Sequence, residues 1–441
     1  KTNEELFWKY FAQNENVINI LANDKSEVQS QFKQSNSYTA NGSLSVNVEQ
    51  GENSFKQLNV ETNTRHDAIS GRTYADAILK NGDIDLFEVS YINSGDIYAI
   101  KCDEVFANYV GIRNSGLQEL ATNYGVNSSE TIPDSIDINE YINLLEITEE
   151  QKQHIADTYL QVISNNIAEE KYTKAEEDVG INGNLYNANV YRIQLTGEEA
   201  KQIMIDCLTT LKTDTETLVL ISNKLSTLGF GVEYTDITNL NLRIDELIAQ
   251  IEQMTMENYL NISVYENDGE TIRTVIEIEN LINIIYDRTE SSETLTLDLV
   301  QEEGIINGVS NITSRIIITK DIAENLTTNN IQIIPDINDI DSNISVMYNL
   351  SNIQSDSINN SYNITINDSS SNIRTITVNY NNNIIRADQV EEITELTNAN
   401  TAVANNYTPE EFMAFMNNWT NLFSQKFMEK MAIIGFNDIG L

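Results

Sequence analysis

The chain has 441 residues, of which 67 are Asp or Glu and 26 are Lys or Arg, so its formal net charge is −41. A polyanion of this kind repels phosphate backbones and anionic lipid headgroups, which argues against nucleic acid as a partner. The sequence contains no apolar run of about 18 residues, the length that a membrane-spanning helix needs.

The first segment predicts an amphipathic helix that lies against a sheet. Its apolar residues recur at helical spacing and form one stripe: Phe7, Tyr10, Phe11, Ile18 and Leu21. Alternating apolar and polar residues then predict strands over 44–48, 58–62 and 75–79. Asn81-Gly82 predicts a tight hairpin turn after the last of these, because both residues accept positive φ.

The stretch "LFEVSYINSGDIYAIKCDE", residues 86–104, alternates on both sides of a break at residues 93–96. This pattern predicts an antiparallel hairpin with one buried face, on which Phe87, Val89 and Tyr91 lie together. The following "YVGIRNSGLQELATNYG" predicts a short strand that leads into a helix.

The central part of the chain is predicted to be mainly helical. A helical region runs from about Ile136 to Lys171, and a polar loop with Gly180 and Gly183 separates it from the strand "NVYRIQL". Thr196 lies three residues before Glu199, which is the spacing of a capping box at the start of a helix. We expect three helices from there to about residue 256.

A second series of strands begins at Tyr259, with a turn at residues 267–269. Its later strands are centred on Ile285, Leu297, Ile317, Val346, Ile366 and Val378. The chain ends in a predicted helix with Thr408 as N-cap, Pro409 in the first turn and Glu411 as capping partner. One side of this helix is apolar: Phe412, Met416, Trp419, Phe423 and Phe427.

This order of elements predicts an α+β fold. We expect two units, each a curved, half-barrel-like antiparallel sheet packed by helices, with helices at both chain ends and a central helical block. The expected division places residues 1–180 in the first unit and 181–441 in the second. Because the chain begins at Lys1 and enters a helix at once, we also expect that a signal peptide or membrane anchor precedes it.

Three stretches carry a resemblance to known proteins: "KTNEELFWKYFAQN", "LFEVSYINSGDIYAIKCDEVFANYVGIRNSGLQEL" and "QVEEITELTNANTAVANNYTPEEFMAFMNNW". The chain resembles uncharacterised extracytoplasmic proteins of clostridial, Gram-positive bacteria, which are tethered by one N-terminal membrane helix. More distantly, its expected architecture is similar to the LolA, LppX and LprG group of lipoprotein and lipid carriers. The resemblance implies a cell-surface location and a half-barrel fold, and it implies no functional residues.

Residue types that commonly carry out catalysis are scarce. His66 and His154 are the only histidines, and Cys102 and Cys207 the only cysteines. Neither histidine has a nucleophile at a recognisable spacing, and these four scattered residues form no zinc-ligand pairs. We expect the histidines at the surface and the cysteines as free thiols, although the sequence leaves a disulfide between them open.

Acidic residues allow two further interpretations. The stretch "DINDIDSN" brings Asp336, Asn338, Asp339 and Asp341 together, which suits calcium, but it lacks the Gly and Glu of an EF-hand loop. An acidic loop is therefore favoured over a calcium site. Two carboxylates could also serve a glycosidase, but with 67 acidic residues a suitable pair arises by chance.

Together these patterns predict a non-enzymatic extracytoplasmic binding protein without cofactor or metal. In one version a sheet face holds an apolar, lipid-like ligand, and in the other the outer surface recognises an envelope component. The candidate ligand-lining residues are Phe87, Val89, Tyr91 and Ile276. The alternatives are a cell-envelope hydrolase that uses Asp or Glu, and a purely structural surface protein.

Overall fold

A computed structural model describes residues 1–20, 26–50, 53–54, 58–125, 147–227, 230–300, 312–324, 326–370 and 373–433. By its packing the chain divides into two units, each assembled from two separate parts of the sequence. Unit 1 comprises residues 1–20 and 137–318, and unit 2 comprises residues 21–136 and 319–441. This division differs from the contiguous halves 1–180 and 181–441 expected from the sequence.

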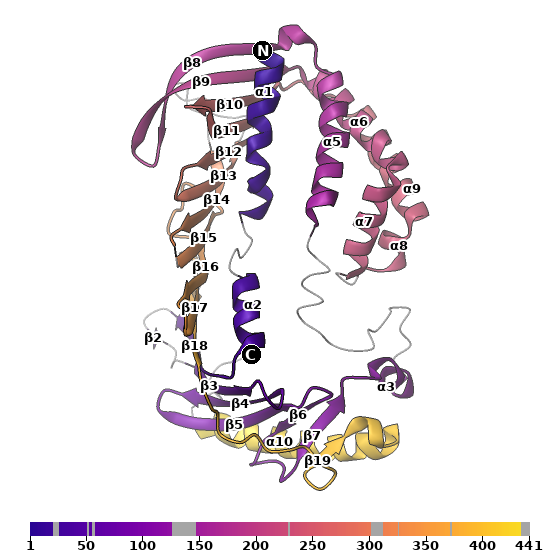
Figure 1. Cartoon of the computed structure of the whole chain (residues 1–441), viewed down its shortest axis with the longest axis vertical. Coiled ribbons are helices and arrows are strands. Elements are labelled where there is room, and N and C mark those ends of the chain that lie inside the picture. Colours follow the sequence, from indigo (N-terminus) through magenta and orange to yellow (C-terminus); the bar gives the residue numbers. More distant parts are fainter. Residues whose placement is uncertain are drawn as a thin grey trace. The chain divides into compact units, whose positions relative to one another are not determined.

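Unit 1 combines a sheet with an N-terminal helix and a block of helices (Figure 1). Its helical elements are α1 (Asn3–Phe11), η1 (Ala12–Asn19), α5 (Glu149–Asn165), η2 (Glu169–Lys171), α6 (Gly197–Thr213), α7 (Thr215–Thr227), α8 (Val232–Thr235) and α9 (Ile237–Gln253). Its strands are β8 (Tyr172–Ile181), β9 (Asn184–Leu195), β10 (Leu260–Asn267), β11 (Glu270–Ile278), β12 (Ile282–Arg288), β13 (Ser292–Val300) and the first part of β14 (Ile312–Ile322).

The strands of unit 1 follow one another in an antiparallel series from β8 to β13, each paired with the next. Helix α1 lies along one face of this sheet, where Phe7 is fully buried among Tyr10, Tyr172 and Ile193. Trp8 Nε1 donates a hydrogen bond to the Tyr172 hydroxyl at 2.9 Å. The predicted packing of the first helix against a sheet is therefore confirmed.

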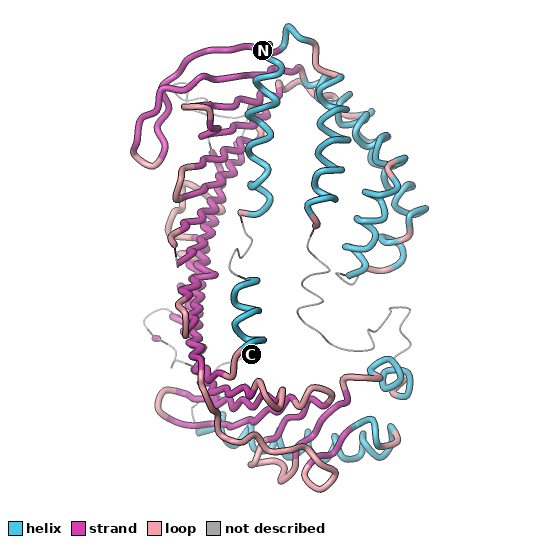
Figure 2. The backbone as a smooth tube through the Cα atoms, in the orientation of Figure 1, coloured by secondary structure: helices cyan, strands magenta, loops and turns pink. Residues whose placement is uncertain are grey.

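The central helices run side by side (Figure 2), and α6 contacts α5, α7 and α9. The predicted capping box begins α6: Glu199 N donates to Thr196 Oγ1 at 3.2 Å, and Thr196 N donates to the Glu199 carboxylate at 2.8 Å. Ile203 of α6 joins the core under α1. This contact ties the helical block to the sheet of unit 1.

Unit 2 is also a sheet with helices. Its helical elements are α2 (Ser26–Ser35), α3 (Leu117–Asn123), η3 (Ala404–Asn406) and α10 (Pro409–Ile433). Its strands are β1 (Tyr38–Gln50), β2 (Asn53–Ser54), β3 (Leu58–Asp67), β4 (Arg72–Asn81), β5 (Ile84–Asn93), β6 (Ile97–Lys101), β7 (Tyr109–Arg113), β15 (Leu326–Ile334), β16 (Asn343–Ile353), β17 (Ser357–Asn367), β18 (Ile373–Arg386) and β19 (Thr401–Val403).

The sheet of unit 2 brings the two separate parts of the chain together, because β1 pairs with β18 on one side and with β3 on the other. From there antiparallel pairing runs outward through β17, β16 and β15, and through β4, β5, β6 and β7. Strand β19 then pairs with β7 in parallel. Helix α10 packs Phe423 and Met431 against the cluster around Leu86 and Phe87.

The α+β class, the antiparallel sheet and the helices at both chain ends are confirmed. The capping of α10 is as predicted, with Glu411 N donating to Thr408 Oγ1 at 3.3 Å. The hairpin predicted at Asn81-Gly82 also forms, but its turn is one residue later: Asn81 pairs with Ile84, and the turn residues are Gly82, with a φ of 58°, and Asp83. Leu21 and residues 136–146 of the predicted helices lie outside the described residues.

The sequence interpretation lacks β8, β15 and β19. Residues 172–181 form β8, which pairs with β9 through a turn in which Asn182 and Gly183 both have positive φ. The acidic run in "YTKAEEDVGI" made this segment look like a polar loop, but alternate residues of an edge strand tolerate charge. The pair Asn182-Gly183 was the turn signal that could have revealed the hairpin.

Loss of the Phe7 ring should destabilise unit 1 strongly. We expect Phe7→Ala to lower the free energy of unfolding by about 3–5 kcal/mol, because it removes a fully buried aromatic side chain and leaves a cavity. Leu185→Ala serves as the control, since Leu185 is 75% exposed in the β8–β9 hairpin and should change stability by less than about 0.5 kcal/mol. Urea denaturation of both variants measures the difference, and equal stabilities would contradict the packing of α1.

Candidate functional site

The strands β11, β12 and β13 carry an apolar surface that we call the apolar ladder. Ile276 lies opposite Ile284, and Ile284 lies opposite Leu297 on the next strand. Two residues further along the strands, Ile282 lies opposite Ile278 on one side and Leu299 on the other. Because side chains of a strand alternate between faces, these six residues share one face: Ile276, Ile278, Ile282, Ile284, Leu297 and Leu299.

The apolar ladder continues the face on which α1 lies, but it is much less covered. Under α1, Ile193 is 1% exposed and Val264 is fully buried. Leu299, by contrast, is 51% exposed, and the other residues of the ladder are partly exposed. Along β12 the residues on both faces are partly exposed, apart from the buried Tyr286. A strand covered on one face would instead alternate between buried and exposed residues.

The back of the same strands carries two bidentate ion pairs, next to the cross-strand pair Val275 and Ile285. Arg273 of β11 donates from Nε and Nη2 to the two carboxylate oxygens of Asp287 of β12, at 2.5 and 2.8 Å. Arg315 of β14 pairs in the same way with Asp298 of β13, at 2.6 and 2.9 Å. Planar two-point contacts of this kind restrict side-chain and strand movement. They hold the apolar ladder in register from the opposite face.

The predicted ligand-lining residues do not form one site within a single unit. Ile276 belongs to the apolar ladder of unit 1, whereas Phe87, Val89 and Tyr91 lie on β5 of unit 2. There Phe87 is 5% exposed and its ring lies 5.2 Å from that of Phe423. Strand alternation indicated correctly that these side chains share faces with other apolar residues, but it cannot show which helix covers a face.

A polar cluster that the sequence did not reveal joins α5 to the α6–α7 junction. His154 Nε2 lies 2.9 Å from Asp214 Oδ1, and the hydroxyls of Tyr159 and Thr217 donate to Asp214 Oδ2 at 3.2 and 2.6 Å. Glu216 Oε2 lies 3.6 Å from His154 Nδ1. Since 60 residues separate His154 from Asp214, no local sequence pattern predicts that they pair.

The electrostatics of this cluster favour an ionised Asp214. Burial raises the pKa of this carboxyl, but hydrogen bonds from Thr217 and His154 outweigh burial and bring the pKa to about 2. The hydrogen bond to Asp214 in turn raises the pKa of His154. Burial, together with the charge of Asp214, raises the pKa of Tyr159 to about 12. The cluster therefore fastens helices by a charged hydrogen-bond network.

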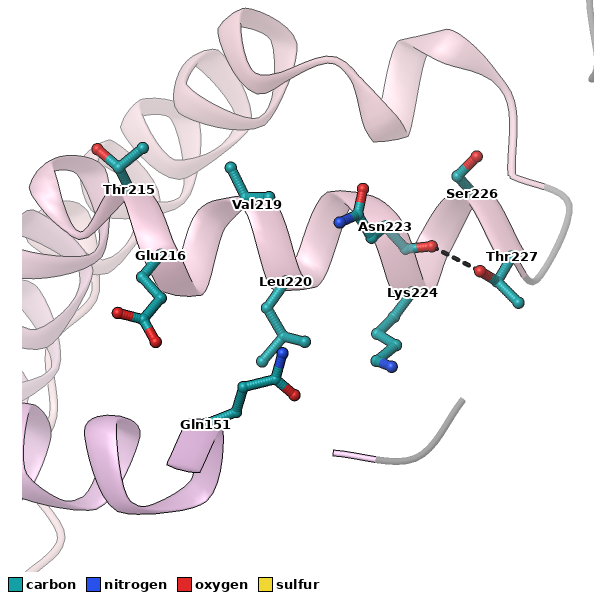
Figure 3. A pocket seen from close by; sticks show the side chains of 9 residues that line it. All are labelled: Gln151, Thr215, Glu216, Val219, Leu220, Asn223, Lys224, Ser226 and Thr227. Atoms are coloured by element: carbon teal, nitrogen blue, oxygen red, sulfur yellow. Dashed lines mark hydrogen bonds between the residues drawn. The ribbon is translucent and has the colours of Figure 1, made fainter. Parts of the chain in front are cut away.

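A hollow of about 760 Å³ opens between α5 and α7 beside this cluster (Figure 3). Gln151 contributes from α5, and the other lining residues lie along α7. Glu216 and Lys224 bring opposite charges to the lining, and Val219 and Leu220 bring apolar surface. This mixture suits a small polar solute better than an acyl chain.

The acidic loop of β15–β16 uses its carboxylates to cap turns. Asp336 accepts a hydrogen bond from Asn338 N at 2.9 Å, and Asp339 accepts from the Ser342 and Ser369 hydroxyls at 2.9 and 2.7 Å. Across the residues that the structure describes, no group of three or more His, Cys, Asp or Glu side chains could hold a metal ion. Cys102 of unit 2 and Cys207 of unit 1 are free thiols.

Fold and site together define a two-unit α+β protein whose sheets carry partly uncovered apolar faces. The chain belongs to a family of unknown function, DUF6583, whose model matches residues 1–438. No curated protein matches it. Within the described part of the chain, no helix combines the length and apolarity needed to cross a membrane.

Comparison with solved structures gives only remote likenesses. A triple mutant of the Rhodopseudomonas blastica porin is 7% identical, with 79% of this chain and 98% of that chain covered and a TM-score of 0.18. OmpF of Salmonella typhi, in complex with daunomycin, is 7% identical, with coverage of 80% and 99% and a TM-score of 0.14. Scores this low carry no argument about fold or function.

The pKa values of the two histidines should be shifted in opposite directions. His154 should have a pKa above the ordinary value of about 6.5 because of Asp214, whereas burial lowers the pKa of His66 despite the nearby Asp67. The stabilisation from the His154 pair is then complete below the ordinary pKa and is lost as pH rises through the raised one.

An NMR pH titration of the imidazole protons measures both values. Asp214→Asn should return the pKa of His154 to the ordinary range and leave that of His66 unchanged, which makes His66 the internal control. A His154 pKa at or below the ordinary value in the parent protein would contradict the hydrogen-bonded pair.

Proposed function

We propose that the protein binds an apolar, lipid-like ligand on the apolar ladder of unit 1 and catalyses no reaction. The observation that supports this proposal most strongly is the partial exposure of six Ile and Leu side chains on a face that α1 buries only in part. Covering apolar surface contributes about 25 cal/mol per Å², so an acyl chain laid along these strands gains free energy from their burial.

The chemistry of the ladder favours an acyl chain over a polar ligand. Its six side chains offer no hydrogen-bond donor or acceptor, and hence no means of recognising sugars or peptides by polar contacts. The bidentate ion pairs on the back of β11–β14 fix the strands before any ligand arrives. Binding to such a preorganised surface loses less conformational entropy than binding to a mobile one.

An extracytoplasmic location is part of the same proposal. The net charge of −41 and the resemblance of the chain to clostridial surface proteins support it. Detection of the native protein on the cell surface by protease shaving of intact cells would test this location.

Ile284→Asp should weaken binding of a fluorescent fatty-acid analogue by at least about tenfold, because an ionised carboxylate in the middle of the ladder disfavours apolar contact. Ile285→Asp is the matched control, since Ile285 is the next residue of β12 and points to the opposite face. Fluorescence titration below the critical micelle concentration of the probe measures both affinities.

Two results would count against the proposal. One is a parent protein that does not bind the probe, and the other is an equal loss of affinity in the two variants. Circular dichroism of each variant checks that the sheet is still folded, so that a loss of affinity reports on the face and not on unfolding.

A further inference from the structure

Three strands of unit 2 present a polar face of unusual uniformity. The register places Asn359 opposite Asn383, Asn363 opposite Asn379, and Asn41 opposite Asn383 on the far side of β18. Over residues 359–367 of β17, 375–383 of β18 and 39–47 of β1, every side chain on this face is Asn, Ser or Thr, and Glu49 follows at the end of β1 opposite Thr375. We call it the amide face: Asn359, Ser361, Asn363, Thr365, Asn367, Thr375, Thr377, Asn379, Asn381, Asn383, Thr39, Asn41, Ser43, Ser45 and Asn47.

Hydrogen bonds between strands fix many of these side chains. Asn359 Nδ2 donates to Asn381 Oδ1 at 3.1 Å, and Asn363 Nδ2 donates to Asn379 Oδ1. Asn367 Oδ1 accepts from the Thr375 hydroxyl at 3.1 Å. A side-chain amide has two donor hydrogens and two acceptor lone pairs, so one such bond leaves capacity for a ligand. Asn379 and Asn381 are exposed, and their remaining donors and acceptors face solvent.

The fifteen residues of the amide face are uncharged, although 21% of the residues in the chain are charged, and the nearest charge on the same three strands is Glu49, at the end of β1 opposite Thr375. Charged side chains occur where the same face continues onto β3 and β4. Glu61 of β3 lies opposite Ser43, and Asp76 and Lys80 lie on β4. Between Thr39 and Asn47 of β1 and across β18 and β17, an ionic partner would find no counter-charge. A neutral partner rich in hydroxyl or amide groups matches both its charge and its hydrogen-bonding capacity.

We propose that the amide face binds a neutral, polyhydroxylated glycan. A glycan carries hydrogen-bond donors and acceptors along an extended chain. The amide face carries donors and acceptors along each of its three strands and from one strand to the next. The cross-strand hydrogen bonds hold the amides in place beforehand, which reduces the entropy lost on binding. The face lies in unit 2 and shares no residue with the apolar ladder of unit 1, so it stands independently of the proposed lipid binding.

Retention on insoluble chitin and cellulose tests this assignment with the whole chain. The parent should be retained to a similar degree at low and high salt, because uncharged contacts are not screened. The double variant Asn379→Asp/Asn381→Asp keeps side-chain size but adds two charges and removes amide donors, and it should reduce retention by about tenfold or more. The control Asn417→Asp/Asn418→Asp makes the same change at exposed positions of α10, also in unit 2, and should be retained like the parent.

Three outcomes would overturn the proposal. They are a parent that is retained on neither glycan, equal retention of the two double variants, and retention that disappears at high salt. Sedimentation velocity provides a further check, because self-association of the parent that only the Asn379→Asp/Asn381→Asp variant abolishes would assign the amide face to a second copy of the chain.

Discussion

The register of the antiparallel pairing is the constraint on which the rest of this structure depends. Because side chains alternate with a period of two, the pairing of Ile284 with Ile276 and Leu297 determines every neighbour on the apolar ladder. The pairing of Asn363 with Asn379 does the same for the amide face. A slip of one residue on β12 would break the apolar ladder, and a slip of one residue on β17 would place isoleucine among the asparagines of the amide face.

The helices then decide which part of each sheet is core and which part is surface. Helix α1 seals the face over β8 to β11, with Phe7 and Tyr10 in contact with the strands. In unit 2, α2 and α10 cover separate regions of the sheet, around Ile384 and around Phe87. Strands between such regions keep partly exposed side chains on both faces. The candidate binding surfaces therefore consist of ordinary strand residues. They are the parts of each sheet that no helix covers in the described structure.

Local sequence signals predicted much of the secondary structure. Capping pairs such as Thr196 with Glu199, and hairpin signals such as Asn81-Gly82, act within a few residues and were recognisable, although that turn lies one residue later than predicted. Strand β8 was missed because its charged residues masked a regular alternation. Strand β19 has only three residues and depends on a parallel partner, β7, about 290 positions earlier, so no local pattern could indicate it.

The sequence by itself determined most of the strands and helices, and which side chains of each share a face, since these follow from periodicity and capping. It also determined the acidity that sets the electrostatic surroundings of every surface. Only the tertiary structure decided that β1 pairs with β18, that Phe87 is covered while Leu299 is half exposed, and that His154 meets Asp214. These features depend on contacts between distant parts of the chain, and residue spacing carries no information about such contacts.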